Sequence, residues 1–173
     1  MTTTITDVSS PNSSGHSETA LLLDWYSLFV EKVAGPSAEP ALKVAIKLRK
    51  WAKTQNITVV HCLIDANAEL TFHRVPGHIS ALKSPGLLDY LKEKGIKSLV
   101  LTGLSTPGCV LRTAVAATDA EFATTVISDA CADTDGEIHQ VILNKIITSR
   151  GHVKSSSEFQ KEFQESQRLK LEV

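Results

Sequence analysis

The sequence has 173 residues, a formal net charge of −1 and 42% hydrophobic side chains, the balance of one globular domain with a buried core. Its 18 basic residues are matched by 19 acidic ones, so we expect no nucleic-acid partner. No stretch approaches the roughly 20 apolar residues of a membrane-spanning helix, so we expect no membrane association either. The cysteine count of three is odd and the N-terminus lacks a secretory signal, which together predict a cytoplasmic location.

The first elements follow a polar N-terminal segment. Residues 1–18 are rich in Ser, Thr, Asn and Pro, which predicts a disordered tail before a single domain over residues 19–173. The apolar run Ala20–Asp24 predicts a strand buried on both faces of a parallel sheet. Apolar side chains recur at helical spacing over Ala38–Gln55, and Ile57–Asp65 predicts the second strand.

Helices and strands alternate through the rest of the chain. We expect residues 66–85 to be irregular, because they carry Pro76 and Gly77 without a clear apolar period. The later elements are predicted at Leu87–Lys94 (helix), Ser98–Gly103 (strand), Cys109–Thr118 (helix), 123–129 (strand), Ile138–Ser149 (helix), 152–156 (strand) and the charged C-terminus (helix). This alternation predicts an α/β fold, a three-layer sandwich with a mostly parallel central sheet flanked by helices on both faces.

Three segments are predicted to meet where such a sheet binds ligands, at the carboxyl ends of its strands. Asp24 and Asp65 end two strands, and the turn Gly103–Cys109 leads from a third strand into a helix. A cysteine near a helix N-terminus gains from the free backbone N–H groups and the helix dipole, which stabilise a thiolate or a nearby oxyanion. We therefore expect Cys109 to be a nucleophile with its thiol at the surface of this crevice, and Asp24 to accept the thiol proton.

The alternative for any one cysteine is a buried, inert side chain, because free cysteines are among the most buried residues. We expect that role for Cys62 and Cys131.

Four segments give the sequence a family resemblance that extends from about Thr19 to Phe159. They are ALLLDWYSLFV, YLKEKGIKSLVLTG, TGLSTPGCVLRTAVAATDAEF and VISDACAD. Together they resemble the isochorismatase-like cysteine hydrolases, a family that includes nicotinamidases and N-carbamoylsarcosine amidase, and STPGCV is most similar to the latter branch. The resemblance implies a parallel sheet flanked by helices and hydrolysis of a C–N bond in an amide or ureide through a thioester on the cysteine.

The same resemblance implies a set of site residues. Asp24 and Cys109 match the catalytic aspartate and cysteine. The oxyanion hole falls on the backbone amides of Ser105 and Cys109, and a cis peptide bond falls between Leu104 and Ser105.

The sequence departs from the family at the catalytic lysine, whose position holds Pro76. Arg74, Lys83 and His78 are the candidates to supply the missing cation, with Arg74 the first choice and counted among the expected catalytic residues. An arginine does not exchange protons near neutral pH, so its expected contribution is electrostatic. We expect one of the three cations within about 4–6 Å of the catalytic carboxylate or thiol.

Further residues are expected to line the substrate pocket, namely Tyr26, His78 and Leu104. Asp65 and His73, with His78, are of the types that ligate zinc, but their spacing differs from that of the metal-binding nicotinamidases. We therefore expect no metal and no cofactor. We further expect a small-molecule substrate and a homo-oligomer.

Two other functions remain open, the first of them because the family lysine is missing. One is a catalytically idle family member that binds a small metabolite or a protein partner. The other is a non-hydrolytic enzyme of a biosynthetic pathway that uses the same crevice.

Overall fold

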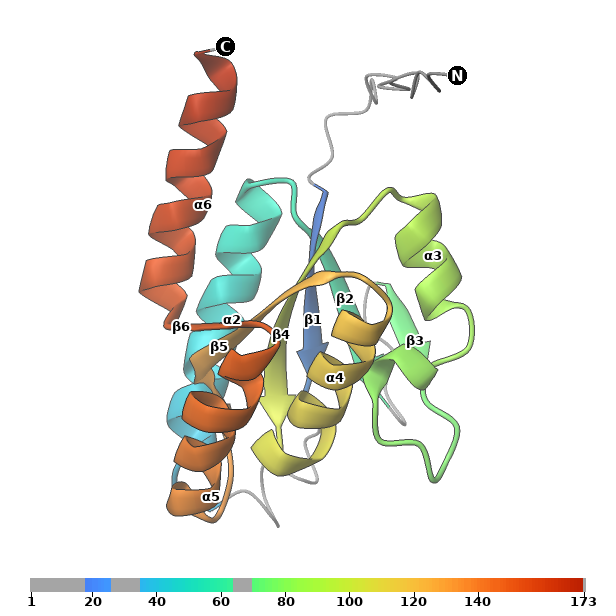
Figure 1. Cartoon of the computed structure of the whole chain (residues 1–173), viewed down its shortest axis with the longest axis vertical. Helices are drawn as coiled ribbons and strands as arrows, with labels where there is room; N and C mark the ends of the chain where they lie inside the picture. The colour runs from blue at the N-terminus through green and yellow to red at the C-terminus, as the bar shows by residue number, and fades with distance from the viewer. Residues whose placement is uncertain (1–17, 26–34, 64–69, 173) are drawn as a thin grey trace, which may run out of the picture.

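The computed structural model describes residues 18–25, 35–63 and 70–172. They form a six-stranded parallel sheet between two layers of helices (Figure 1). This architecture confirms the predicted three-layer α/β fold. The N-terminal tail predicted for residues 1–18 lies outside the described residues, apart from Glu18.

The sheet has the strand order β3-β2-β1-β4-β5-β6, and every neighbouring pair is parallel. The central strand β1 pairs with β2 on one side and with β4 on the other. Strands β2 and β3 therefore extend the sheet to one side of β1, and the later strands extend it to the other side. Such a switch point opens a crevice at the carboxyl ends of the strands. The strands are β1 (Thr19–Asp24), β2 (Thr58–Leu63), β3 (Thr71–His73), β4 (Ser98–Leu104), β5 (Ala123–Ala132) and β6 (His152–Lys154).

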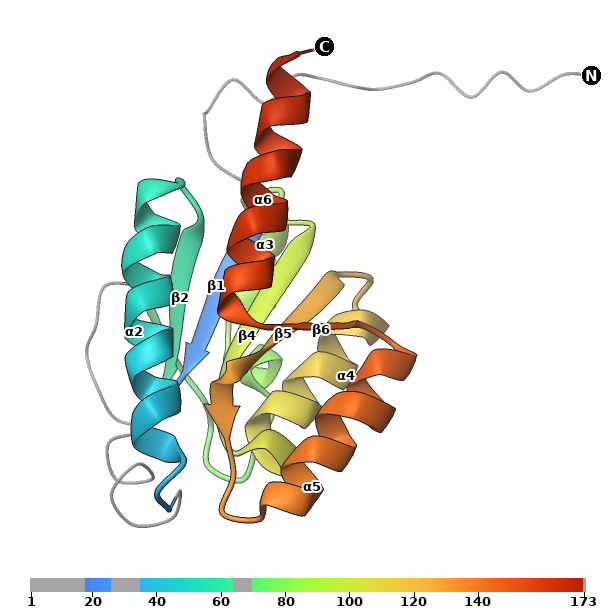
Figure 2. The same ribbon diagram turned by 90° about the vertical axis from the view of Figure 1, so that its left-hand side faces the viewer.

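The helices cover both faces of the sheet, as Figure 2 shows for α2 and α6 on one side and α4 and α5 on the other. The helices are α2 (Ala38–Thr54), α3 (Leu87–Glu93), α4 (Leu111–Asp119), α5 (Gly136–Val141) and α6 (Ser156–Leu171). Within the described part of the chain, no helix is both long enough and apolar enough to cross a membrane.

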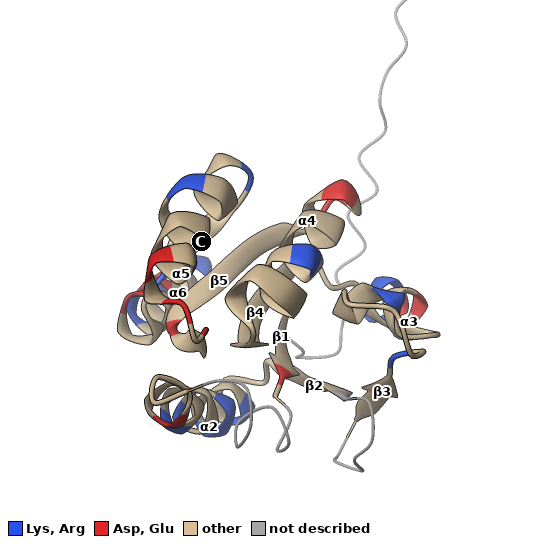
Figure 3. Cartoon of the chain, turned by 90° about the horizontal axis from the view of Figure 1, so that it is seen from below, with Lys and Arg blue, Asp and Glu red and all other residues tan. Residues whose placement is uncertain are grey.

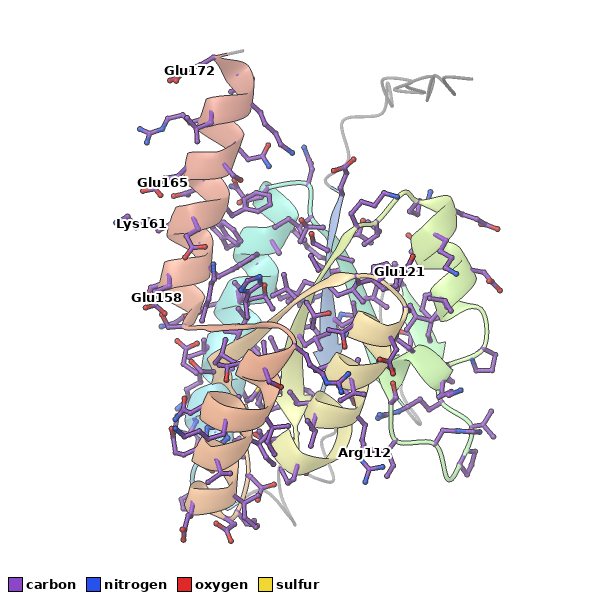
Figure 4. All side chains as sticks on the ribbon, in the orientation of Figure 1. Arg112, Glu121, Glu158, Lys161, Glu165 and Glu172 are labelled. Carbon is purple, nitrogen blue, oxygen red and sulfur yellow. The ribbon has the colours of Figure 1, made fainter. Side chains whose placement is uncertain are left out.

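Side chains that alternate along the strands pack into two separate hydrophobic layers. On β1, Leu22 packs in the layer beneath α3 and α4, whereas Leu21 and Leu23 pack in the layer beneath α2 and α6. In the second layer, Trp51 of α2 meets Phe163 of α6 edge to face, with ring centroids 5.6 Å apart. The opposite side of α6 is charged, and Figure 4 shows Lys161 and Glu165 projecting away from the sheet.

The structure differs from the predicted elements in three places. The short edge strand β3 lies in the region predicted to be irregular. The helix predicted to begin at Cys109 begins at Leu111, because a wide turn over Thr106–Val110 precedes it and Gly108 has non-helical dihedrals (φ −87°, ψ −108°). The segment predicted as one helix over Ile138–Ser149 consists of the end of α5 followed by a π-helical and a 3-10 turn.

Candidate active site

The candidate site lies at the switch point, where β1 and β4 end side by side. Asp24 is the last residue of β1, and the turn after Leu104 of β4 leads through Cys109 into α4. Figure 3 views this carboxyl edge of the sheet, and most of the charged residues lie on the surrounding helices. Asp24 differs from these residues, because it lies at the end of a strand and its side chain is buried inside the protein.

Gly103 allows the two strand ends to approach each other. It pairs with Asp24 in the sheet and has a φ of +150°. A Cβ atom at this position would lie 2.5 Å from the backbone oxygen of Asp24 and 2.9 Å from its Cβ atom. A side chain at residue 103 would therefore displace the carboxylate.

Gly103→Ala is expected to lower the free energy of unfolding by about 1–3 kcal/mol, because the added methyl group overlaps the backbone of β1. Urea denaturation at pH 7 measures this loss. Gly77→Ala is the matched control, because Gly77 also has a positive φ, of 89°, but its added Cβ would meet nothing within 4 Å. Equal losses in the two variants would mean that positive φ alone, and not the approach to Asp24, causes the effect.

Asp24 is paired with Arg74, which directly follows β3. The guanidinium Nη1 donates to Oδ2 of Asp24 at 2.9 Å and Nη2 donates to Oδ1 at 2.7 Å, which makes a bidentate pair. Nη1 also donates to the backbone oxygen of Ile79. Of the three candidate cations, Arg74 is thus the one at the carboxylate, whereas the side chains of Lys83 and His78 are exposed at the surface.

The ionisation of Asp24 depends on opposing effects. Burial raises the pKa of Asp24 to about 6, while the charge of Arg74 and hydrogen bonds from Cys109 and Arg74 lower it. The carboxylate is therefore ionised at neutral pH and takes up a proton as the pH falls through about 6.

Cys109 is also buried, with 5% of its surface exposed. Its Sγ lies 2.8 Å from the backbone oxygen of Leu104 and is also a hydrogen-bond partner of Asp24, so these two acceptors compete for the single thiol proton. Burial raises the pKa of the Cys109 thiol well above its usual value, the charge of Asp24 raises it further, and Arg74 lowers it. The expectation of an exposed thiolate at a helix N-terminus is therefore wrong for this structure, in which the buried thiol is neutral.

The turn between β4 and α4 carries the predicted oxyanion-hole residues. The peptide bond between Leu104 and Ser105 is cis, which confirms what the family resemblance implied. Within the turn, the amides of Gly108 and Val110 donate to the carbonyl of Ser105, at 3.2 and 3.3 Å. The assignment of the Ser105 and Cys109 amides to an oxyanion hole remains a prediction.

Thr106 in this turn makes hydrogen bonds with residues outside it, which the sequence did not indicate. The hydroxyl oxygen of Thr106 lies 2.8 Å from Nδ1 of His139 on α5 and 3.2 Å from the carbonyl oxygen of Ala132 on β5. No sequence spacing could have revealed the contact with His139, because 33 residues separate Thr106 from His139.

Within the described part of the chain, Asp24 and Cys109 line a cavity of about 10 Å³. That volume accommodates about one water molecule. The walls are completed by Leu22, Ala81, Leu101, Thr102, Val110 and Thr113.

The remaining predicted residues do not line this cavity in the described structure. Tyr26 and Asp65 lie outside the described residues. The side chain of Leu104 packs with small residues of α2 and β5, so Leu104 meets Cys109 through its carbonyl. His73 and His78 are exposed, and among the described residues no three His, Cys, Asp or Glu side chains are grouped as a metal site requires.

Comparison with known proteins adds three kinds of similarity. The model of the family described as "Isochorismatase domain" matches residues 63–158. A nicotinamidase of Acinetobacter baylyi is 44% identical over 52 residues, which are 30% of this chain and 24% of that protein, so the match spans only about a quarter of the relative.

The third similarity is to solved structures. An isochorismatase-like hydrolase from Alkaliphilus metalliredigens superimposes with a TM-score of 0.74 at 24% identity, covering 85% of this chain and 99% of that one. The N-carbamoylsarcosine amidase of Thermoplasma acidophilum has a TM-score of 0.66 at 18% identity, covering 80% of this chain and 95% of the other. At these identities the structural matches establish the fold.

Proposed function

Because this chain belongs to the isochorismatase family of hydrolases, we propose that it cleaves the C–N bond of a small amide or ureide with Cys109 as the nucleophile. The observation that supports this proposal is the convergence of Asp24, Arg74 and Cys109 at the switch point of the sheet. A thiol, a carboxylate and a fixed cation provide the nucleophile, the base and the charge compensation for acyl transfer.

The first half of the proposed reaction forms a thioester. Sγ of Cys109 attacks the carbonyl carbon as its proton moves to the carboxylate of Asp24, and the backbone amides of Ser105 and Cys109 stabilise the oxyanion. When the oxyanion collapses, the C–N bond breaks and Asp24 returns the proton to the departing nitrogen. Since the thiol is neutral before attack, Asp24 must act as a general base during bond formation.

The second half uses water. Asp24 takes a proton from a water molecule as its oxygen adds to the thioester carbon, and the C–S bond then breaks. The Cys109 thiolate recovers the proton from Asp24, which leaves the acid product and restores the starting site.

Arg74 takes no part in these proton transfers, because a guanidinium stays protonated throughout the physiological range. Its proposed function is to keep Asp24 ionised inside the protein and to offset the negative charge that develops beside it. A single carboxylate therefore carries every proton in this scheme.

The pH profile tests the base. We expect kcat/KM to fall about tenfold per pH unit below about pH 6, because protonation of Asp24 removes the acceptor for the thiol proton. Initial rates between pH 4.5 and 8 measure this profile. A profile that is flat through pH 6 would contradict the assignment of Asp24 as the base.

A substrate screen tests the function itself. The purified protein is incubated with nicotinamide, N-carbamoylsarcosine and other small amides and ureides, and ammonia release is measured. The first two compounds are chosen from the names of the relatives. Release that depends on Cys109 supports the proposal.

A catalytically idle family member is the second candidate, and the raised pKa of the Cys109 thiol favours it. Its expected result is no ammonia from any compound, together with alkylation of Cys109 by iodoacetamide no faster than that of Cys62 or Cys131.

A further inference from the structure

The contact between Thr106 and His139 joins the candidate site to two elements outside it. Thr106 is fully buried and directly follows Ser105. Its hydroxyl lies between Nδ1 of His139, at 2.8 Å, and the carbonyl oxygen of Ala132, at 3.2 Å. The turn over Thr106–Val110 is thereby tied to α5 and to the end of β5.

The chemistry of the three groups determines where the protons lie. The carbonyl of Ala132 only accepts, and the Thr106 hydroxyl has a single proton to donate. If the hydroxyl donates to Ala132, Nδ1 of His139 must carry a proton and donate to the Thr106 oxygen. This Nδ1–H arrangement satisfies all three groups, and it is possible for both the neutral and the protonated imidazole.

We propose that His139 is a positioning residue for the hydrolase site, which acts through Thr106 to fix the turn that carries Ser105 and Cys109. This inference rests on the proposed function. Among the described residues, the amides of Gly108 and Val110 donate to the Ser105 carbonyl inside the turn, and the Cys109 thiol reaches the strand ends at Leu104 and Asp24, so Thr106 is what connects the turn to α5 and to the end of β5. A shift of the turn would move the proposed nucleophile and both oxyanion donors together relative to Asp24.

The surroundings of His139 argue against a pH switch. His139 is half-buried and lines a polar crevice of about 450 Å³, which is faced by Asp129 of β5, Lys154 of β6 and Glu158 of α6. Burial lowers the pKa of His139, while Asp133 raises it. Since Nδ1 donates in either protonation state, titration of His139 should leave the link to Thr106 intact.

The test compares two substitutions of one residue. His139→Leu removes the ring nitrogen, whereas His139→Asn places an amide nitrogen at the same number of bonds from the backbone as Nδ1. We expect His139→Leu to lower kcat by about 10- to 100-fold with little change in KM, because small displacements of reacting groups cost that much. We expect His139→Asn to recover most of the loss and to keep the wild-type pH profile.

A double-substitution experiment shows whether the effect passes through Thr106. Thr106→Val should lower kcat to a similar extent, and adding His139→Leu to it should cause no further loss, since the link is already broken. His152→Leu is the matched control, because His152 is an exposed histidine at the start of β6, and its kcat should be unchanged.

Alkylation of Cys109 gives a readout that needs no substrate. We expect iodoacetamide to modify Cys109 several-fold faster or slower in His139→Leu than in the wild type, and at the wild-type rate in His139→Asn. Unchanged kcat and unchanged alkylation in His139→Leu would overturn the positioning inference, as would equal defects in the leucine and asparagine variants. A wild-type protein that releases no ammonia but shows the alkylation differences would overturn the proposed function, and would leave the link between His139 and the turn established.

Discussion

Cys109→Ala is expected to lower the turnover of any amide or ureide substrate by about 10⁴-fold or more, because no other group can form the thioester. The substitution should also affect stability, because Cys109 is buried beside Val110. Its position in the sequence had suggested a thiol at the surface of a crevice. The alanine variant should therefore lose about 1 kcal/mol of stability but remain folded. Ammonia release measures the first effect, and urea denaturation measures the second.

Two further variants make the cysteine result specific. Cys109→Ser keeps a donor for the Leu104 carbonyl and should be as inactive as the alanine variant while staying closer to wild-type stability. Cys62→Ala removes another fully buried thiol and should keep its activity. Substantial turnover by Cys109→Ala would exclude the thioester mechanism and leave chemistry performed by Asp24 alone.

Arg74→Met is expected to lower the free energy of unfolding at pH 7 by about 3–5 kcal/mol, because it leaves the carboxylate of Asp24 buried without its counter-charge. Arg150→Met is the control, since Arg150 pairs with Asp119 at 3.9 Å on the surface and should contribute only about 0–1 kcal/mol. Arg74→Lys should recover part of the loss, because it restores a charge without the bidentate geometry. A loss in Arg74→Met no larger than that in Arg150→Met would contradict the proposed charge compensation.

The pH dependence of this loss has a definite sign. Without Arg74 the folded-state pKa of Asp24 should rise further above its value in the unfolded chain. The folded variant then binds the Asp24 proton more tightly than the unfolded chain does, so its stability increases as the pH falls from 7 through that pKa. Urea denaturation at pH 7 and pH 5 should therefore show the smaller difference from the wild type at pH 5.

The local signals in the sequence were sufficient for five of the six strands in the described sheet and for the strand ends that face the site. The uninterrupted apolar run before Asp24 and the small residues after Gly103 are properties of single segments, and both segments occupy the predicted edge of the sheet. The family resemblance added the cis bond before Ser105, which no propensity would indicate.

The features that sequence analysis missed depend on contacts between distant segments. The strand β3 has three residues, too few to show an apolar period, so sequence analysis missed the strand that precedes Arg74, although it did expect Arg74 as the cation near Asp24 or Cys109. The burial of Cys109 was missed for the same reason. Its thiol is buried among side chains from several elements, and this burial raises the pKa of the thiol well above its usual value.

The location of Arg74 affects the local stability of the sheet at its edge strand β3. β3 is an edge strand that pairs with β2 over only three residues, so fraying should begin there sooner than in the central strands. The bidentate ion pair between Arg74 and Asp24 connects the end of β3 to the end of β1, which lies two strands further toward the centre of the sheet. When Asp24 takes up a proton near pH 6, its ion pair with Arg74 weakens. Amide hydrogen exchange in β3, corrected for intrinsic rates, should therefore accelerate relative to exchange in β1 and β4 over the same pH range. The ion pair thus couples the charge state of Asp24 in the candidate site to the local opening of the edge of the sheet.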